Sequence, residues 1–307
     1  LWPSVMALAL AFGAAGSAHG SDPAPGGKAS AEARWTPSVR GGFLHQFDTD
    51  LDDGGSFNAD RFFIRGGLSY AMGPRRRISF AMGVGRDRYD FSGDTGFSAL
   101  RPWKRVNRLR FSAPVNWSID GDWTLFLLPT LRFYGESGAD LGDSATGGGL
   151  AGFSFRFSDT LTLGPGLGVL TGLEDSVSVF PVLIIDWKLT DRLSLETGRG
   201  LGATQGPGLT LRYRVSDAWS LALGGRYESL RFRLDDRGPA PDGVGEDRSF
   251  PLSLSATYEP GRDFQLSVLG GVELGGTLRL EDSKGRRIAK DDYDTAPFLG
   301  VACNVRF

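Results

Sequence analysis

The chain has 307 residues, enough for one large domain or two small ones, and its 34 Lys and Arg against 36 Asp and Glu leave a formal net charge of −2. This near-neutral balance gives no sign of a nucleic-acid partner or of a charged tail. A single cysteine, Cys303, excludes an internal disulfide framework and a cysteine-based metal site. With 45 Gly and 21 Phe, the composition favours many short strands and turns over helices.

The first 20 residues differ from the rest of the chain. Residues 5–15 (VMALALAFGAA) form an apolar run of signal-peptide length, too short to span a bilayer as a helix. Small residues follow and suit cleavage. We therefore interpret residues 1–20 as a signal peptide and residues 21–33 as a flexible periplasmic linker. A buried N-terminal helix is the alternative. No later segment approaches 18 consecutive apolar residues, so the sequence predicts no transmembrane helix.

From Arg34 to Phe307, segments of alternating hydrophobicity are separated by two kinds of break that take turns. One kind is short and contains Ser/Thr-Asp, Asp-Gly or Pro-Gly, and the other is mostly longer and often acidic. Short turns at one end and long loops at the other predict an all-β domain, an antiparallel up-and-down transmembrane β-barrel. Fourteen strands are counted, with a range of about 12 to 16. They are 34–47, 61–72, 77–89, 105–117, 123–134, 148–157, 160–172, 177–189, 192–199, 207–215, 218–230, 248–258, 263–275 and 293–307.

Successive side chains of a strand point to opposite faces, so parity assigns each residue to one side of the wall. In strand 61–72, Phe62 and Ile64 share one face, and Arg61 and Arg65 share the other. A soluble sandwich would carry Lys, Glu and Asp opposite its apolar face, whereas here that face is mostly Gly, Ser, Thr and Arg. The pattern predicts lipid outside and a polar lumen inside. Aromatic residues beside the short breaks would form an interfacial belt. They are Trp117, Trp123, Phe157, Trp187, Tyr213, Trp219, Tyr258 and Phe264.

The last strand ends in an aromatic residue, and Leu299, Val301 and Val305 share the face of Phe307. This segment resembles the C-terminal signal of Gram-negative outer-membrane β-barrel proteins of the porin-like kind. The resemblance covers residues 34–307 as architecture. It implies a place in the outer membrane, contact with its lipid, and recognition of these four residues by the barrel-assembly machinery.

Arginine dominates the predicted lumen face, where acids are few. Because a positive field in a water-filled lumen attracts anions, we expect a passive channel for small, preferentially anionic solutes. Loops 90–104, 135–147 and 233–247 are candidate constrictions. An Arg–carboxylate network that plugs the barrel is the alternative, and it would suit a structural or surface-interaction barrel with acidic extracellular loops. The candidate pore-lining residues are Arg40, Arg65, Arg108, Arg110, Arg132, Arg156, Arg212, Arg214 and Arg226.

Catalytic chemistry has little support in the sequence, and we expect no enzyme, cofactor or metal site. Of the two histidines, His19 lies in the predicted signal peptide. His45 falls on the lipid side without a serine-hydrolase motif nearby, so a lipid-modifying enzyme is the least favoured function. The acidic segment 48–53 (DTDLDD) lacks the Gly and terminal Glu of an EF-hand and is interpreted as a solvated loop.

Overall fold

The computed structural model describes residues 9–10, 34–174, 177–197 and 208–307. The predicted signal peptide (1–20) and linker (21–33) therefore lie outside the described residues, except for β1 (Ala9–Leu10), which pairs in parallel with β10 (Val177–Lys188). Within the described ranges, no helix has the length and hydropathy needed to cross a bilayer.

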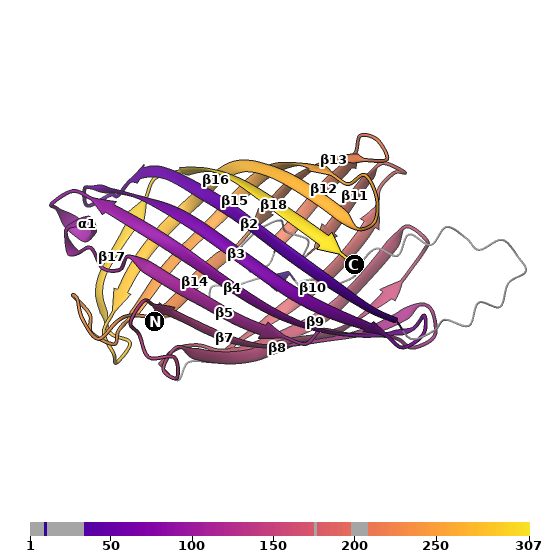
Figure 1. Cartoon of the computed structure of the whole chain (residues 1–307), viewed down its shortest axis with the longest axis horizontal. Coiled ribbons are helices and arrows are strands. Elements are labelled where there is room, and N and C mark those ends of the chain that lie inside the picture. Colours follow the sequence, from indigo (N-terminus) through magenta and orange to yellow (C-terminus); the bar gives the residue numbers. More distant parts are fainter. Residues whose placement is uncertain (1–8, 11–33, 175–176, 198–207) are drawn as a thin grey trace, which may run out of the picture.

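One sheet forms a closed barrel (Figure 1), and β18 pairs antiparallel with β2 to place Val305 opposite Val39. Its described part has 18 strand segments. Apart from β1, these segments make up fourteen wall strands in the described chain, because three of the wall strands are each divided into two segments. The predicted fold, an antiparallel up-and-down β-barrel of about fourteen strands, is therefore confirmed. The undivided strands are β2 (Arg34–Asp50), β3 (Ser56–Ala71), β4 (Arg76–Ser92), β7 (Trp123–Glu136), β8 (Ala145–Arg156), β9 (Leu161–Thr171), β10, β11 (Leu193–Thr197), β12 (Gly208–Arg214), β15 (Val244–Tyr258) and β16 (Phe264–Glu281). The divided strands are β5 (Arg105–Ser112) with β6 (Val115–Ser118), β13 (Trp219–Arg226) with β14 (Glu228–Arg233), and β17 (Arg287–Tyr293) with β18 (Ala296–Arg306).

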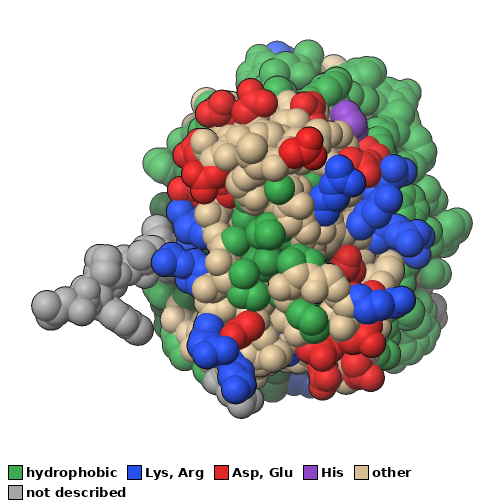
Figure 2. All heavy atoms as spheres, turned by 90° about the vertical axis from the view of Figure 1, so that its left-hand side faces the viewer, with side chains coloured by type: hydrophobic (Ala, Val, Ile, Leu, Met, Phe, Trp, Pro, Cys, Tyr) green, Lys and Arg blue, Asp and Glu red, His purple; other side chains and the backbone are tan. Residues whose placement is uncertain are grey.

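The outer surface of the wall is apolar. Phe62, Phe80 and Leu254 are 50%, 57% and 59% exposed, whereas Ser255, next along β15, is buried at 8%. Seen end-on, hydrophobic side chains lie around the flank of the barrel (Figure 2). An apolar surface of this extent would drive aggregation in water, and closed barrels are the β architecture that a bilayer accommodates. The protein is therefore a transmembrane β-barrel of the outer-membrane type.

Tight turns at one end are held by short side chains that accept backbone hydrogen bonds. Asp120 Oδ1 accepts from the N–H of Trp123 at 3.0 Å, and Ser216 Oγ accepts from the N–H of Trp219 at 3.2 Å. These bonds explain why Asp-Gly and Ser-Asp recur before a strand. Both tryptophans are exposed on the outer face, as an interfacial belt requires. We assign this end to the periplasm, because outer-membrane barrels have their short turns there.

The barrel narrows toward the extracellular end. β7 and β14 pair in parallel at Gly135 and Arg233, although β8 to β12 lie between them in the sheet order. The Arg233 guanidinium also donates to the carbonyl oxygens of Asp143 at 3.1 Å and Asp242 at 2.7 Å, which joins two extracellular loops. The lumen at this level is enclosed by β14 to β17 and β2 to β7. So few strands leave a space that side chains can fill.

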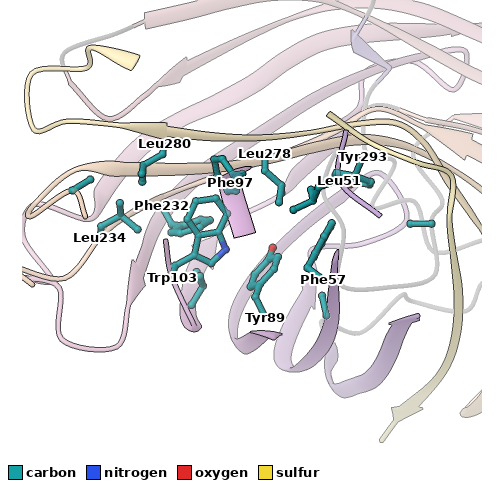
Figure 3. Packing of buried hydrophobic residues seen from close by; sticks show 14 of the residues in the cluster. Leu51, Phe57, Tyr89, Phe97, Trp103, Phe232, Leu234, Leu278, Leu280 and Tyr293 are labelled. Atoms are coloured by element: carbon teal, nitrogen blue, oxygen red, sulfur yellow. The ribbon is translucent and has the colours of Figure 1, made fainter. Parts of the chain in front are cut away.

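An apolar cluster, called the apolar plug below, fills this narrow end (Figure 3). Phe57 and Tyr89 point inward from β3 and β4, and Leu278 meets them from β16. The loop between β4 and β5, which contains α1 (Gly96–Leu100), contributes Phe97 and Trp103. In Figure 2, which faces this end, no open mouth leads into the lumen. The apolar plug comprises Leu51, Phe57, Ala59, Tyr89, Phe97, Trp103, Val106, Tyr134, Phe232, Leu234, Ala240, Leu278, Leu280, Tyr293 and Ala296.

Candidate pore and its closed end

Four arginines, called the arginine row below, lie side by side across neighbouring strands. The register places Arg40 of β2 opposite Arg65 of β3, and Arg65 opposite Gly83 of β4. Gly83 in turn lies opposite Arg110 of β5, and Arg110 lies opposite Arg132 of β7. Strand alternation puts all five residues on the side opposite the apolar belt. Because the strands of a barrel are tilted, the arginine row runs obliquely along the wall, with Arg40 nearer the periplasmic side and Arg132 nearer the extracellular end.

Within the described part of the chain, Arg65, Arg110 and Arg132 of the arginine row form no ion pair with a carboxylate. Arg65 donates from Nη2 to Ser112 Oγ at 3.1 Å. The Nε atoms of Arg110 and Arg132 are buried and have no hydrogen-bond partner among the described residues. Arg110 also lies close enough to Arg65 and Arg132 for their positive charges to repel, and Arg40 stands in the same relation to Arg65. Cations gathered in this way make the place attractive to anions.

Two further predicted pore-lining residues are held in ion pairs. Arg108 contacts Asp87, with 2.7 Å between Nη2 and Oδ1, and both side chains are buried. Arg226 donates from Nε to the carboxylate of Glu228, two residues along the chain. The charge of each of these arginines is largely balanced, because a paired carboxylate lies in direct contact with it.

The remaining three lie near the periplasmic turns. Arg212 donates to Ser220 Oγ at 3.2 Å, and Arg214 donates to the carbonyl oxygen of Asp191 in the turn between β10 and β11. Arg156 is the last residue of β8 and is exposed. The nine predicted residues therefore do not form one site: four make the arginine row, two are ion-paired, and three lie close to the periplasmic end.

A buried ion network lies directly beneath the apolar plug. Arg61 is 3.0 Å from Asp247 and 2.5 Å from Glu273, and all three side chains are almost fully buried. The hydroxyl of Tyr89 donates to Asp247 at 2.8 Å, and that of Tyr293 donates to Glu273 at 2.9 Å. Both tyrosines also belong to the plug, so the apolar and ionic layers form one continuous closure of the lumen.

Sequence reasoning did not select this network. Parity placed Arg61 opposite Phe62, and therefore inside, but its partner Asp247 falls in a segment that the sequence predicts as a loop. Asp247 instead belongs to β15, which begins at Val244. A usable signal was present: in the extracellular parts of the strands, apolar residues alternate toward the lumen, as at Phe57 and Ala59.

His45 pairs with a carboxylate on the outer face of the barrel. Its Nδ1 lies 2.7 Å from Asp60 Oδ1, and its ring meets that of Phe47 edge-on, with 4.9 Å between centroids. The His45 and Asp60 side chains are each 39% exposed on the outer face, above the apolar belt. Among the described residues, no group of His, Cys, Asp and Glu is arranged to hold a metal ion.

Several solved structures are similar to this chain. An outer-membrane channel from Pseudomonas putida F1 is 14% identical, with a TM-score of 0.49, and the alignment covers 93% of this chain and 99% of that one. A Pseudomonas aeruginosa FadL homologue is 12% identical, with a TM-score of 0.45 and 89% of each chain covered. The toluene transporter TodX of P. putida is 8% identical, with a TM-score of 0.44, 89% of this chain and 90% of that one covered.

Sequence comparison places the chain in a family. A search of curated proteins finds no match to the chain. The family model described as a domain of unknown function, DUF6268, matches residues 118–307, which run from the end of β6 to the C-terminal residue. Because this match covers more than half of the sequence, the chain belongs to the DUF6268 family.

Proposed function

We propose that the protein is an outer-membrane channel for small anionic solutes, and that the arginine row selects them. The observation that supports this proposal is the juxtaposition of Arg65, Arg110 and Arg132, whose positive charges repel one another and which form no ion pair among the described residues. In a lumen bounded by a low-dielectric wall, such a group raises the local concentration of anions and lowers that of cations.

The apolar plug and the buried ion network determine when solutes pass. Together they fill the extracellular end, so a solute crosses the barrel only when this end rearranges. We therefore expect the resting barrel to conduct poorly and the plug to act as its gate. Trp103 is the residue to change, because it lies in the middle of the plug, with four aromatic rings around it.

Planar-bilayer recordings test selectivity and gating together. We expect small currents from the wild type and larger currents from Trp103→Ala, with chloride more permeant than potassium. Arg110→Gln with Arg132→Gln in the Trp103→Ala background should move the reversal potential toward that of a non-selective pore. Arg88→Gln is the matched control, because Arg88 lies on the outer face with 55% of its side chain exposed. Cation preference in the opened barrel, or an unchanged reversal potential without Arg110 and Arg132, would overturn the proposal.

The same closure favours a second candidate function, a structural or surface-interaction barrel. A lumen filled by an apolar plug resembles a protein core more than a water-filled pore. This function predicts no current from the wild type or from Trp103→Ala, and unchanged uptake of small anions when the gene is deleted. The bilayer recordings therefore separate the two candidates.

A further inference from the structure

Gly83 leaves a place without a side chain in the middle of the arginine row. A Cβ atom at Gly83 would meet nothing nearer than 3.7 Å, and two of its three nearest atoms belong to the Arg65 side chain. Gly85, two residues further along β4 on the same inward face, is different. There the Nη2 of Arg108 lies 3.1 Å from the equivalent position, because Arg108 crosses Gly85 on its way to Asp87. A guanidinium thus lies over Gly85, whereas the atoms nearest to the equivalent position at Gly83 are the Arg65 Cβ and Cγ and the backbone oxygen of Ile64, all at 3.7 Å.

Donors surround the place at Gly83. Arg65 and Arg110 flank Gly83 on the two neighbouring strands, and Arg132 lies beyond Arg110. Because paired strands are about 4.8 Å apart, the backbones of Arg65 and Arg110 are separated by roughly 10 Å, which two arginine side chains can bridge around a compact anion. The Ser112 hydroxyl, already in contact with Arg65, adds a further polar group beside them.

We propose that this place is a binding site for a multivalent oxyanion of the phosphate class. Arg65, whose guanidinium lies beside Ser112, and Arg110 contact the oxyanion, and Arg132 adds charge from the next strand. A tetrahedral dianion matches planar guanidinium forks, which donate two parallel hydrogen bonds each, whereas chloride offers no such geometry. A bound dianion would also relieve the repulsion among the three cations and provide a partner for the buried Arg110 Nε. This inference rests on the proposed function and names the solute class of the same lumen.

The test is calorimetric titration of the full-length barrel in detergent with inorganic phosphate, and with sulfate, chloride and acetate for comparison. We expect saturable binding of phosphate and sulfate, at least tenfold tighter than that of chloride or acetate. Arg110→Gln should weaken phosphate binding tenfold or more. Gly83→Leu keeps every charge but fills the place at Gly83, so it should abolish binding. Gly66→Leu is the matched control and should bind as the wild type does, because Gly66 faces lipid and a Cβ there would meet no atom within 4 Å.

Phosphate binding by Gly83→Leu at wild-type affinity, or binding no tighter than that of chloride, would overturn the inference. Its failure is distinguishable from that of the proposed function. A barrel that prefers chloride over potassium in bilayers but binds no phosphate retains the function and lacks this site. Binding that depends on Gly83, in a barrel that carries no anion-selective current, retains the site and contradicts the channel.

Discussion

Replacing Trp103 with alanine should both destabilise the barrel and open its extracellular end. The indole is 2% exposed, and its ring centroid lies 5.2 Å from Phe232, 5.6 Å from Phe97 and 5.9 Å from Tyr89. Truncating a buried aromatic side chain costs about 3–5 kcal/mol, because the transfer free energy is lost and a cavity remains. The neighbours of Trp103 belong to three different segments of the chain, so collapse into the cavity is hindered. We therefore expect a loss toward the upper end of this range.

The assay is reversible urea unfolding of the barrel in lipid vesicles, followed by tryptophan fluorescence. Trp219→Ala is the control, since Trp219 is 49% exposed on the outer face and its ring contact with Tyr258 contributes only about 1 kcal/mol. If Trp103→Ala loses less than about 2 kcal/mol, or no more than the control, the aromatic rings of the plug do not pack as a core. An unchanged bilayer current in the destabilised variant would refute its role in closing the lumen.

Three other substitutions test separate parts of the structure. Arg61→Met should lower the free energy of unfolding by about 3–5 kcal/mol, because the substitution leaves two buried carboxylates without a cation. Adding Asp247→Leu and Glu273→Leu should restore most of the lost stability, and urea unfolding measures both variants. His45→Ala should change the free energy of unfolding by less than about 1 kcal/mol, because the His45–Asp60 pair is partly exposed. Neither the variant nor the wild type should hydrolyse phospholipid vesicles. Hydrolysis by the wild type that is lost in His45→Ala would establish catalysis. Phe307→Ala should reduce the fraction of barrel assembled in cells, which heat-modifiable gel mobility measures. The free energy of unfolding of the refolded variant should stay within about 1 kcal/mol of the wild-type value. Assembly equal to that of the wild type would contradict the role of Phe307 in the C-terminal signal.

The sequence was sufficient to predict the barrel, and the extent of its strands was harder to predict. Alternation with apolar residues outward marks only the part of a strand that touches lipid. β3 begins at Ser56, five residues before the predicted start at Arg61. In that extension the phase of the pattern is inverted, with Phe57 buried inside and Asp60 half-buried outside. Above the membrane the outer face meets water and the lumen is packed, so hydrophobicity alone gives a strand that is too short.

The closed end depends on contacts that no local pattern encodes. Arg61 and Asp247 are 186 residues apart in the sequence, and only the strand order brings them together. The loop that contributes Trp103 could equally have projected into solvent, because its sequence does not specify which way it turns. A register shift near Gly275, which has a φ of +57°, turns Leu278 toward the lumen. The role of the arginine row in selecting anions stays a prediction, since it follows from charge and register alone.

The buried ion network also has a consequence for how the cylinder is sealed. The first and last wall strands meet at the junction of β2 and β18, the one place where closure joins the two ends of the chain. Arg61 stands on β3, on one side of this seam, and Glu273 stands on β16, on the other. The Arg61–Glu273 ion pair therefore links the strands on the two sides of the seam from inside the lumen. An assembly intermediate in which β2 and β18 are not yet paired lacks this ion pair. Arg61 and Glu273 then stay hydrated until β18 pairs with β2. Closure of the barrel is thus expected to be a late and cooperative step of assembly, in which the β2–β18 hydrogen bonds and the Arg61–Glu273 ion pair form together.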